Sequence, residues 1–372
     1  MFRRRKTHFT RPRHADYVIV ACTGILVVFG LVMLASASSH LGQTKFDDTY
    51  FYLTRQILYG LSFGVVGFFL GWWINYQRYE KFSLIFLCGS LILLALIFTS
   101  MGVHANGASR WLKIGPITFQ PSELLKITYI MYLAAWLGKR GERSRNFWNG
   151  FFPFLLVSAV ISGLLLAEHA TSIVVILMGT ALIVYFASGA KLRYVAGLAL
   201  VGTLALAAIV YVTPYRLERV MTFVRGEELD VRGAGYQLNQ ALTAIGAGGL
   251  WGVGYGQSTT KISYLPEPIG DSVFAVVAEE FGFVGSAAVL AVFLILVVRI
   301  FLRARGSRDK FGQLLLVGFG SIIALQVFVN VGAISGIIPL TGTPLPFISY
   351  GGTALAVFMT ISGILVNITK RS

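Results

Sequence analysis

The sequence has few charged residues and few cysteines for its length. Only 13% of its 372 residues are charged, whereas 56% are hydrophobic and the mean hydropathy is +0.73. This composition excludes a soluble globular domain of this size. The two cysteines, Cys22 and Cys88, fall inside apolar segments and lack the paired spacing of a metal site or redox motif. We therefore expect both to be packing residues.

A nucleotide-binding motif is also missing. The glycine-rich run 246–256 superficially resembles a phosphate-binding loop, but it has no Walker lysine, no following serine or threonine, and no preceding strand. Glycine adopts positive φ and lets another backbone approach closely. We therefore expect a tight or re-entrant segment that lines an outer cavity. No internal repeat of the inverted transporter kind is evident.

Apolar segments of about 20 residues, long enough to cross roughly 30 Å of hydrocarbon as a helix, make up most of the chain. They predict an all-α polytopic membrane protein, with residues 1–372 forming one integral membrane domain of ten spans. The predicted spans are 15–38, 51–74, 82–101, 121–137, 151–167, 171–188, 193–213, 271–302, 311–335 and 345–369.

Basic residues collect on one side of these spans. With the amino terminus inside, the inner side holds 21 Lys/Arg and 4 Asp/Glu, and the outer side 10 and 12, which accounts for the net charge of +15. Lysine and arginine hold loops in the cytoplasm, so we predict a multi-pass protein of the cytoplasmic membrane with both termini, including the basic tail 1–14, inside. Because these charges are scattered over short loops, we interpret them as a topology signal with attraction to anionic lipid, not as a nucleic-acid site.

The outer side carries the longer polar segments, 102–120, 214–270 and 336–347, while the inner loops are short. Segment 214–270, at about 57 residues, is too long to be a simple connector. We predict that it is a large extracytoplasmic loop between spans seven and eight, and that any chemistry takes place at the outer face. Segment 336–347 is rich in proline and glycine, which indicates irregular backbone beside a cavity.

Three acidic residues mark the start of span eight. Asp271 stands at the membrane boundary, where a carboxylate is costly to bury and well placed to exchange protons, so it is a functional candidate. Glu279 and Glu280 follow eight and nine residues later, which turns them about 80° and 180° away from Asp271 on a helix. They cannot both face the same surface, and both a structural hydrogen bond and a catalytic role are open for the one that points inward.

Span four begins with Pro121 and Ser122, which are helix-start signals. Glu123 and Lys126 lie three residues apart and share one face. In one interpretation they form an ion pair with each other. In the other, Lys126 faces a cavity and meets an anionic group, either Asp271 or a substrate phosphate.

Together these segments resemble the SEDS (shape, elongation, division and sporulation) family, the polytopic peptidoglycan glycosyltransferases. The matching runs extend nearly end to end: 31–38, Ser109-Arg110-Trp111, Gln120-Pro121-Ser122-Glu123, Tyr264-Leu265-Pro266-Glu267 with Asp271, Glu279-Glu280-Phe281-Gly282, and 345–352. The run 257–264 is more similar to the division (FtsW) branch than to the elongation (RodA) branch.

The chain departs from the family pattern at two places. The family has Thr-Asp-Phe at the catalytic aspartate, whereas this chain has Gly270-Asp271-Ser272. Before span six, the family's Pro-Asp pair is absent and Glu168-His169 stands instead. We therefore carry no family role over to that loop.

The resemblance implies polymerisation of lipid II, with Asp271 as the general base that takes a proton from the acceptor GlcNAc 4-hydroxyl as it attacks the MurNAc anomeric carbon with inversion. Arg110, Lys113 and Lys126 are the candidates for holding the diphosphate, since cations stabilise a leaving group's charge. The full set of predicted substrate-binding residues is Arg110, Lys113, Glu123, Lys126, Lys261, Glu267, Glu280 and Ser349.

The resemblance also implies partners: lipid II, the glycan linked to undecaprenyl pyrophosphate, division proteins, and a class B penicillin-binding transpeptidase. No cofactor is demanded, although a divalent cation (Mg²⁺ or Mn²⁺) is compatible with the substrate diphosphate. Two alternatives stay open. A lipid II flippase would need polar access from both faces, and a scaffold that only activates the transpeptidase would not need Asp271.

Overall fold

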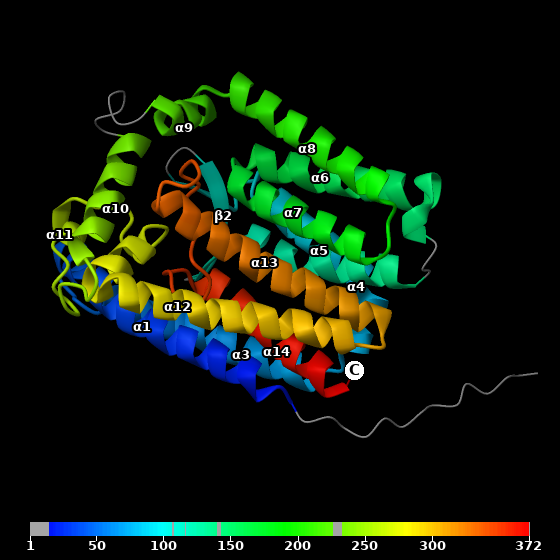
Figure 1. Ribbon diagram of the computed structural model, residues 1–372, viewed down its shortest axis with the longest axis horizontal. Helices are drawn as coiled ribbons and strands as arrows, with labels where there is room; N and C mark the ends of the chain where they lie inside the picture. Colours follow the sequence, from blue (N-terminus) through cyan, green and yellow to red (C-terminus); the bar gives the residue numbers. More distant parts are fainter. Residues whose placement is uncertain (1–14, 106–107, 116, 140–142, 226–232, 372) are drawn as a thin grey trace, which may run out of the picture.

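Long apolar helices lie side by side along most of the chain in the computed structural model (Figure 1), which describes residues 15–105, 108–115, 117–139, 143–225 and 233–371. The predicted tail 1–14 lies outside these residues. The helices are α1 Tyr17–Phe46, α2 Phe51–Arg55, α3 Ser62–Trp73, α4 Tyr76–Leu96, α5 Pro121–Gly138, α6 Phe152–Ala167, α7 Thr171–Ala187, α8 Leu192–Val212, α9 Pro214–Arg225, α10 Ala234–Gly248, α11 Thr260–Ser263, α12 Val273–Gly306, α13 Lys310–Ile334 and α14 Gly352–Arg371.

The helices confirm a polytopic membrane fold that is helical except for one small sheet. Within the described ranges, eight helical segments are long and apolar enough to cross a membrane. Two of them include a π-helical stretch, Gln56–Leu61 between α2 and α3 and Phe147–Phe151 before α6. The shorter α7 and the more polar α5 coincide with the two remaining predicted spans. The count of ten therefore stays a prediction that the helix positions support.

Two segments on the predicted outer side differ from the sequence prediction. Residues 345–351, expected at the start of the last span, are not helical, and α14 begins only at Gly352. Residues 102–119 contain a small antiparallel sheet of strands β1 Gly102–Ala105, β2 Ala108–Ile114 and β3 Ile117–Phe119, in that order. Strands of three to seven residues give too short a pattern to separate from loop, so this sheet was missed.

Helices α13 and α14 lie at the centre of the bundle. In each, 72% of the most apolar stretch is buried, against 6% in α8. Since α8 has no protein cover on most of its surface, its apolar side chains suit contact with lipid tails. Cys22 is buried in α1 as expected, but Cys88 is exposed on α4, so the prediction that both cysteines pack inside the protein is wrong for Cys88.

Helices α3 and α14 cross in close contact because glycine stands at the crossing. A Cβ atom added at Gly363 would lie 2.1 Å from the carbonyl oxygen of Phe68, and one added at Gly71 would lie 2.9 Å from the backbone nitrogen of Ile364. Backbone atoms cannot move aside as a flexible side chain can. Small residues at this crossing therefore set the distance between the two helices.

We predict that Gly363→Ala lowers the thermal unfolding midpoint of the detergent-solubilised protein, because overpacking of this kind costs roughly 1–3 kcal/mol. The matched control is Gly24→Ala in α1, where an added Cβ meets no atom within 4 Å and alanine favours the helix. Equal midpoints for the two variants would contradict the close crossing.

Candidate active site

Asp271 lies in the turn immediately before α12, and two other segments, α13 and residues 336–351, hold the backbone of this turn. The side-chain amide of Asn330, on α13, donates to the carbonyl oxygen of Asp271 at 2.8 Å and to that of Thr343 at 2.7 Å. The hydroxyl of Ser349 donates to the carbonyl of Gly270 at 2.6 Å. Segment 336–351 is therefore fixed against the aspartate turn, and its backbone is irregular, as the proline and glycine pattern predicted.

Burial and neighbouring charges both affect the carboxyl group of Asp271. Its Oδ1 is buried without a hydrogen-bond partner, and its Oδ2 is 3.4 Å from the point that a Cβ at Gly342 would occupy. Burial, followed by the negative charge of Glu267, raises the pKa of Asp271 to about 6, against opposing effects that include the amide of Gln237 and the charge of Arg219. A carboxylate with this pKa is ionised at neutral pH, yet a stronger base than an ordinary aspartate.

Arg219 lies on α9, in the large predicted outer loop, and its guanidinium is near Gly342 as well. Its Nη1 donates to the carbonyl of Leu340 at 3.2 Å and lies 4.0 Å from the hypothetical Cβ of Gly342. Its Nε is buried and unpaired. Gly342 has φ +64°, a conformation that favours glycine. The absence of a Cβ there also leaves a point open that is within 4.0 Å of both the Asp271 carboxyl and the Arg219 guanidinium.

The sequence analysis did not find Arg219, Gln237 or Asn330. The only local signal was that Arg219 is one of the ten basic residues on the predicted outer side. The partners of all three are distant in sequence, so no spacing rule connects them.

Glu123 and Lys126 form a second buried pair, at the start of α5. The Lys126 nitrogen is 2.6 Å from Glu123 Oε1 and 2.8 Å from Gln326 Oε1. Gln326 in turn donates to the carbonyl of Pro344 at 2.9 Å. The structure thus shows the first of the two interpretations above, and the recorded partners of Lys126 do not include Asp271. The pair is nonetheless tied to the same segment, 336–351, that contacts the aspartate turn.

Arg110, on β2, is anchored by the loop that departs from the family pattern. Its guanidinium donates to the carbonyls of His169 at 2.7 Å and Glu168 at 3.4 Å. Glu168 is buried and accepts a hydrogen bond from Ser122 at 3.1 Å. Burial raises the pKa of Glu168 to about 8, against the effects of the Ser122 hydroxyl and Arg110. The unusual Glu168-His169 pair therefore orients a predicted substrate-binding arginine.

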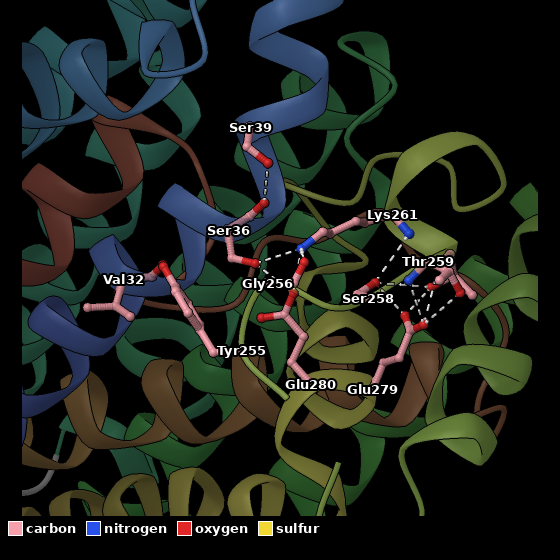
Figure 2. Close-up of polar contacts among 11 residues, drawn as sticks. Val32, Ser36, Ser39, Tyr255, Gly256, Ser258, Thr259, Lys261, Glu279 and Glu280 are labelled. Carbon is pink, nitrogen blue, oxygen red and sulfur yellow. Dashed lines mark hydrogen bonds and ion pairs between the residues drawn. The ribbon is translucent and has the colours of Figure 1, made fainter. Parts of the chain in front are cut away.

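The other predicted site residues separate into two groups. Lys113 is exposed on β2, and no hydrogen bond or ion pair of its ammonium is recorded with the described part of the chain. Glu267 is exposed and has φ +49° in the aspartate turn. Lys261 and Glu280, in contrast, are buried and pair with each other at 2.6 Å (Figure 2).

Comparison with known proteins places the chain in a family. The model of the FtsW/RodA/SpoVE family, described as "cell cycle protein", matches residues 16–372. The chain is 36% identical to the probable peptidoglycan glycosyltransferase FtsW of Geobacter sp. (strain M18), covering 96% of this chain and 97% of that protein. It is 35% identical to the stage V sporulation protein E of Bacillus subtilis (strain 168), covering 98% and 99%.

Solved structures agree. One from a peptidoglycan synthase complex that coordinates polymerization and crosslinking superposes with a TM-score of 0.77 at 28% identity, over 95% of this chain and 97% of that one. The rod shape determining protein RodA of Thermus thermophilus superposes with a TM-score of 0.70 at 26% identity, over 96% and 98%. With sequence and fold both matching over nearly the whole chain, this protein belongs to the FtsW/RodA/SpoVE family of membrane-spanning cell cycle proteins.

Proposed function

We propose that this protein is a peptidoglycan glycosyltransferase that polymerises lipid II into glycan strands at the outer face of the cytoplasmic membrane. The names of its FtsW relatives and its likeness to a peptidoglycan synthase complex support this reaction. The observation that carries the proposal is the carboxyl of Asp271. Its Oδ1 is buried and unpaired, and its Oδ2 and Arg219 Nη1 both lie within 4.0 Å of the point that a Cβ at Gly342 would occupy. An unpaired buried carboxylate oxygen is costly, and a substrate hydroxyl would satisfy it.

Asp271 acts as the general base. It accepts the proton of the acceptor GlcNAc 4-hydroxyl while that oxygen bonds to the MurNAc anomeric carbon and the bond to the lipid diphosphate breaks. A single displacement of this kind inverts the anomeric centre. Positioned general-base catalysis contributes roughly 10²–10⁴-fold to the rate.

Cationic side chains stabilise the departing diphosphate. Arg110, Lys113 and Lys126 were predicted for this role from the sequence, and the position of Arg219 beside Asp271 adds a fourth candidate. Lys113 has the most accessible charge of the four, since Lys126 is committed to Glu123 and Gln326. A divalent cation, Mg²⁺ or Mn²⁺, is compatible with the oxygens of the substrate diphosphate. The described residues include no group of three or more His, Cys, Asp or Glu side chains that could hold a metal ion.

The orientation follows from the charge distribution. Both termini face the cytoplasm, and segment 214–270, which contains α9, α10 and α11, lies outside. The partner is a class B penicillin-binding transpeptidase that crosslinks the new strands, as the relative solved in a complex for polymerization and crosslinking suggests. The division process is the proposed setting, supported by the run 257–264 and by the FtsW relatives.

Replacing the base tests the chemistry. Asp271→Asn should reduce glycan polymerisation from purified lipid II by at least 10²-fold without lowering the thermal unfolding midpoint. Asp47→Asn, which changes an exposed outer carboxylate at the end of α1, should retain activity. Substantial polymer from Asp271→Asn would remove the assignment of the base.

The pH dependence should report the same carboxyl. Because the ionised form is the base, kcat/KM should rise with pH and level off above about 6, the pKa of Asp271. Arg219→Gln removes a charge that favours the carboxylate, so the midpoint should move to higher pH. Glu267→Gln removes a charge that opposes it, so the midpoint should move to lower pH. Shifts in the same direction, or none, would show that another group titrates.

Donor binding is tested at Lys113. Lys113→Gln should raise the KM for lipid II several-fold and leave thermal stability unchanged, because its exposed ammonium has no recorded protein partner to lose. Lys45→Gln removes an equally exposed lysine at the outer end of α1 and controls for general attraction of the anionic substrate. Equal effects of the two variants would exclude a specific contact at Lys113.

A further inference from the structure

Helix α12 is broken nine residues after its start. Gly282 has φ 65° and ψ −165°, which no α-helix contains. In an unbroken helix the N–H groups of Phe283 and Val284 would donate to the carbonyls of Glu279 and Glu280. Residues 273–281 are therefore a separate outer half-helix, and the break leaves four backbone groups without their helical partners.

The glycine-rich segment 249–254 supplies those four partners. The bonds are Phe283 N–H to Gly249 O at 2.9 Å, Val284 N–H to Leu250 O at 3.1 Å, Val253 N–H to Glu279 O at 2.9 Å, and Gly254 N–H to Glu280 O at 3.1 Å. The N–H groups of Phe283 and Val284 thus donate to the segment, and the carbonyls of Glu279 and Glu280 accept from it, so both partners of each missing helical bond are satisfied. Since unpaired buried backbone groups are costly, the break is stable only while this segment is docked.

Glycine is required where the two backbones meet. A Cβ at Gly252, whose φ is +81°, would lie 2.2 Å from the carbonyl oxygen of Glu280. A Cβ at Gly282 would lie 2.4 Å from the nitrogen of Gly252. The glycine-rich run that superficially resembles a phosphate-binding loop therefore packs its backbone against the break in α12.

Two carboxylates of the half-helix fasten the rest of this loop (Figure 2), and they bind different residues of it, as expected of neighbours that cannot both face the same surface of a helix. The Glu279 carboxylate accepts hydrogen bonds from the hydroxyls of Ser258 and Thr260 and from the backbone N–H of Thr259 at 3.0 Å. It thereby caps the turn that leads into α11.

Glu280 joins the loop to α1. Its Oε1 lies 2.6 Å from the Lys261 nitrogen and 2.6 Å from the Ser36 hydroxyl, and Lys261 also donates to Ser36 at 2.7 Å. The hydroxyl of Tyr255 donates to the carbonyl of Val32 at 2.9 Å. We call the loop 249–261 together with Ser36, Glu279 and Glu280 the clamp.

A buried ion pair is a poor way to gain stability. The side chains of Lys261 and Glu280 are 4% and 0% exposed, and the cost of removing two charges from water can exceed their attraction. What such a pair does provide is a unique arrangement, because any other register would leave both charges unpaired. The clamp therefore selects one position of the half-helix.

The half-helix connects the clamp to the active site. Glu279 lies eight residues after Asp271, about 12 Å along a helix, and none of the clamp side chains has a recorded contact with the Asp271 carboxyl. We propose that Lys261, Glu279 and Glu280 are positioning residues, which hold the outer half-helix so that Asp271 faces Arg219 and the acceptor hydroxyl. This role rests on the proposed glycosyltransferase reaction and replaces direct substrate contact for Lys261 and Glu280.

Hydrogen exchange tests the clamp without reference to activity. In the Lys261→Met protein, amide exchange should become at least ten-fold faster in peptides covering 249–256 and 282–285, and stay unchanged in α13. Lys310→Met, which removes a half-buried lysine at the far end of the bundle, should change neither region of the clamp. Unchanged exchange in folded Lys261→Met would overturn the proposal.

Kinetics separate positioning from substrate contact. Lys261→Met and Glu280→Gln should each lower kcat at least ten-fold while the KM for lipid II stays within about two-fold. A raised KM with unchanged kcat would instead make these residues substrate contacts and overturn positioning. In the double variant Lys261→Met/Glu280→Met, thermal stability should recover but kcat should not; recovery of both would reduce the pair to a structural role.

Two further outcomes are decisive. If Lys261→Met fails to fold, Ser36→Ala removes one small hydroxyl from the clamp and should accelerate exchange in the same peptides, and no acceleration there would overturn the proposal. If the wild-type protein makes no glycan under any condition, the proposed function fails, and the hydrogen-exchange result decides the clamp by itself.

Discussion

The structure depends on hydrogen bonds that pair the backbone and polar side chains removed from water by the membrane-embedded fold. Asn330 serves two carbonyls, and Gln326 links Lys126 to Pro344. The break at Gly282 is tolerated because segment 249–254 completes it. In lipid no water can replace a missing hydrogen-bond partner. Non-helical backbone therefore occurs only where such contacts satisfy its polar groups.

Some buried polar atoms of the described chain nevertheless stay unpaired. Three of them, Asp271 Oδ1, Arg219 Nε and Asn330 Oδ1, belong to residues at or near the aspartate turn, and two more, Glu123 Oε2 and Glu168 Oε2, belong to carboxyls at the start of α5 and just after α6. Unsatisfied groups of this kind concentrate at functional sites. A sugar hydroxyl would provide the donor that the carboxyl oxygens lack, and a diphosphate would provide the acceptor that the guanidinium lacks. The polar atoms left unpaired in the fold are therefore available to bind substrate.

The sequence predicted what local rules control. Hydropathy located the helices, the spacing of three residues brought Glu123 and Lys126 together, and helix geometry predicted that Glu279 and Glu280 cannot both face the same surface. Contacts between distant segments were out of reach. The approach of Arg219 to Asp271 depends on a glycine more than 100 residues from Arg219, and the pairing of Lys261 with Glu280 depends on a helix break. Periodicity could not reveal that break, because the apolar pattern continues through Gly282.

The most direct measurement of the central claim is a cryo-EM structure of the Asp271→Asn protein, in complex with its cognate transpeptidase, trapped with lipid II. The account predicts that the acceptor 4-hydroxyl lies within hydrogen-bond distance of residue 271 and that the donor diphosphate contacts Arg219 or Lys113 at the outer face. Lipid II bound in a passage open to both faces, with its sugars away from residue 271, would contradict the polymerase and favour a flippase.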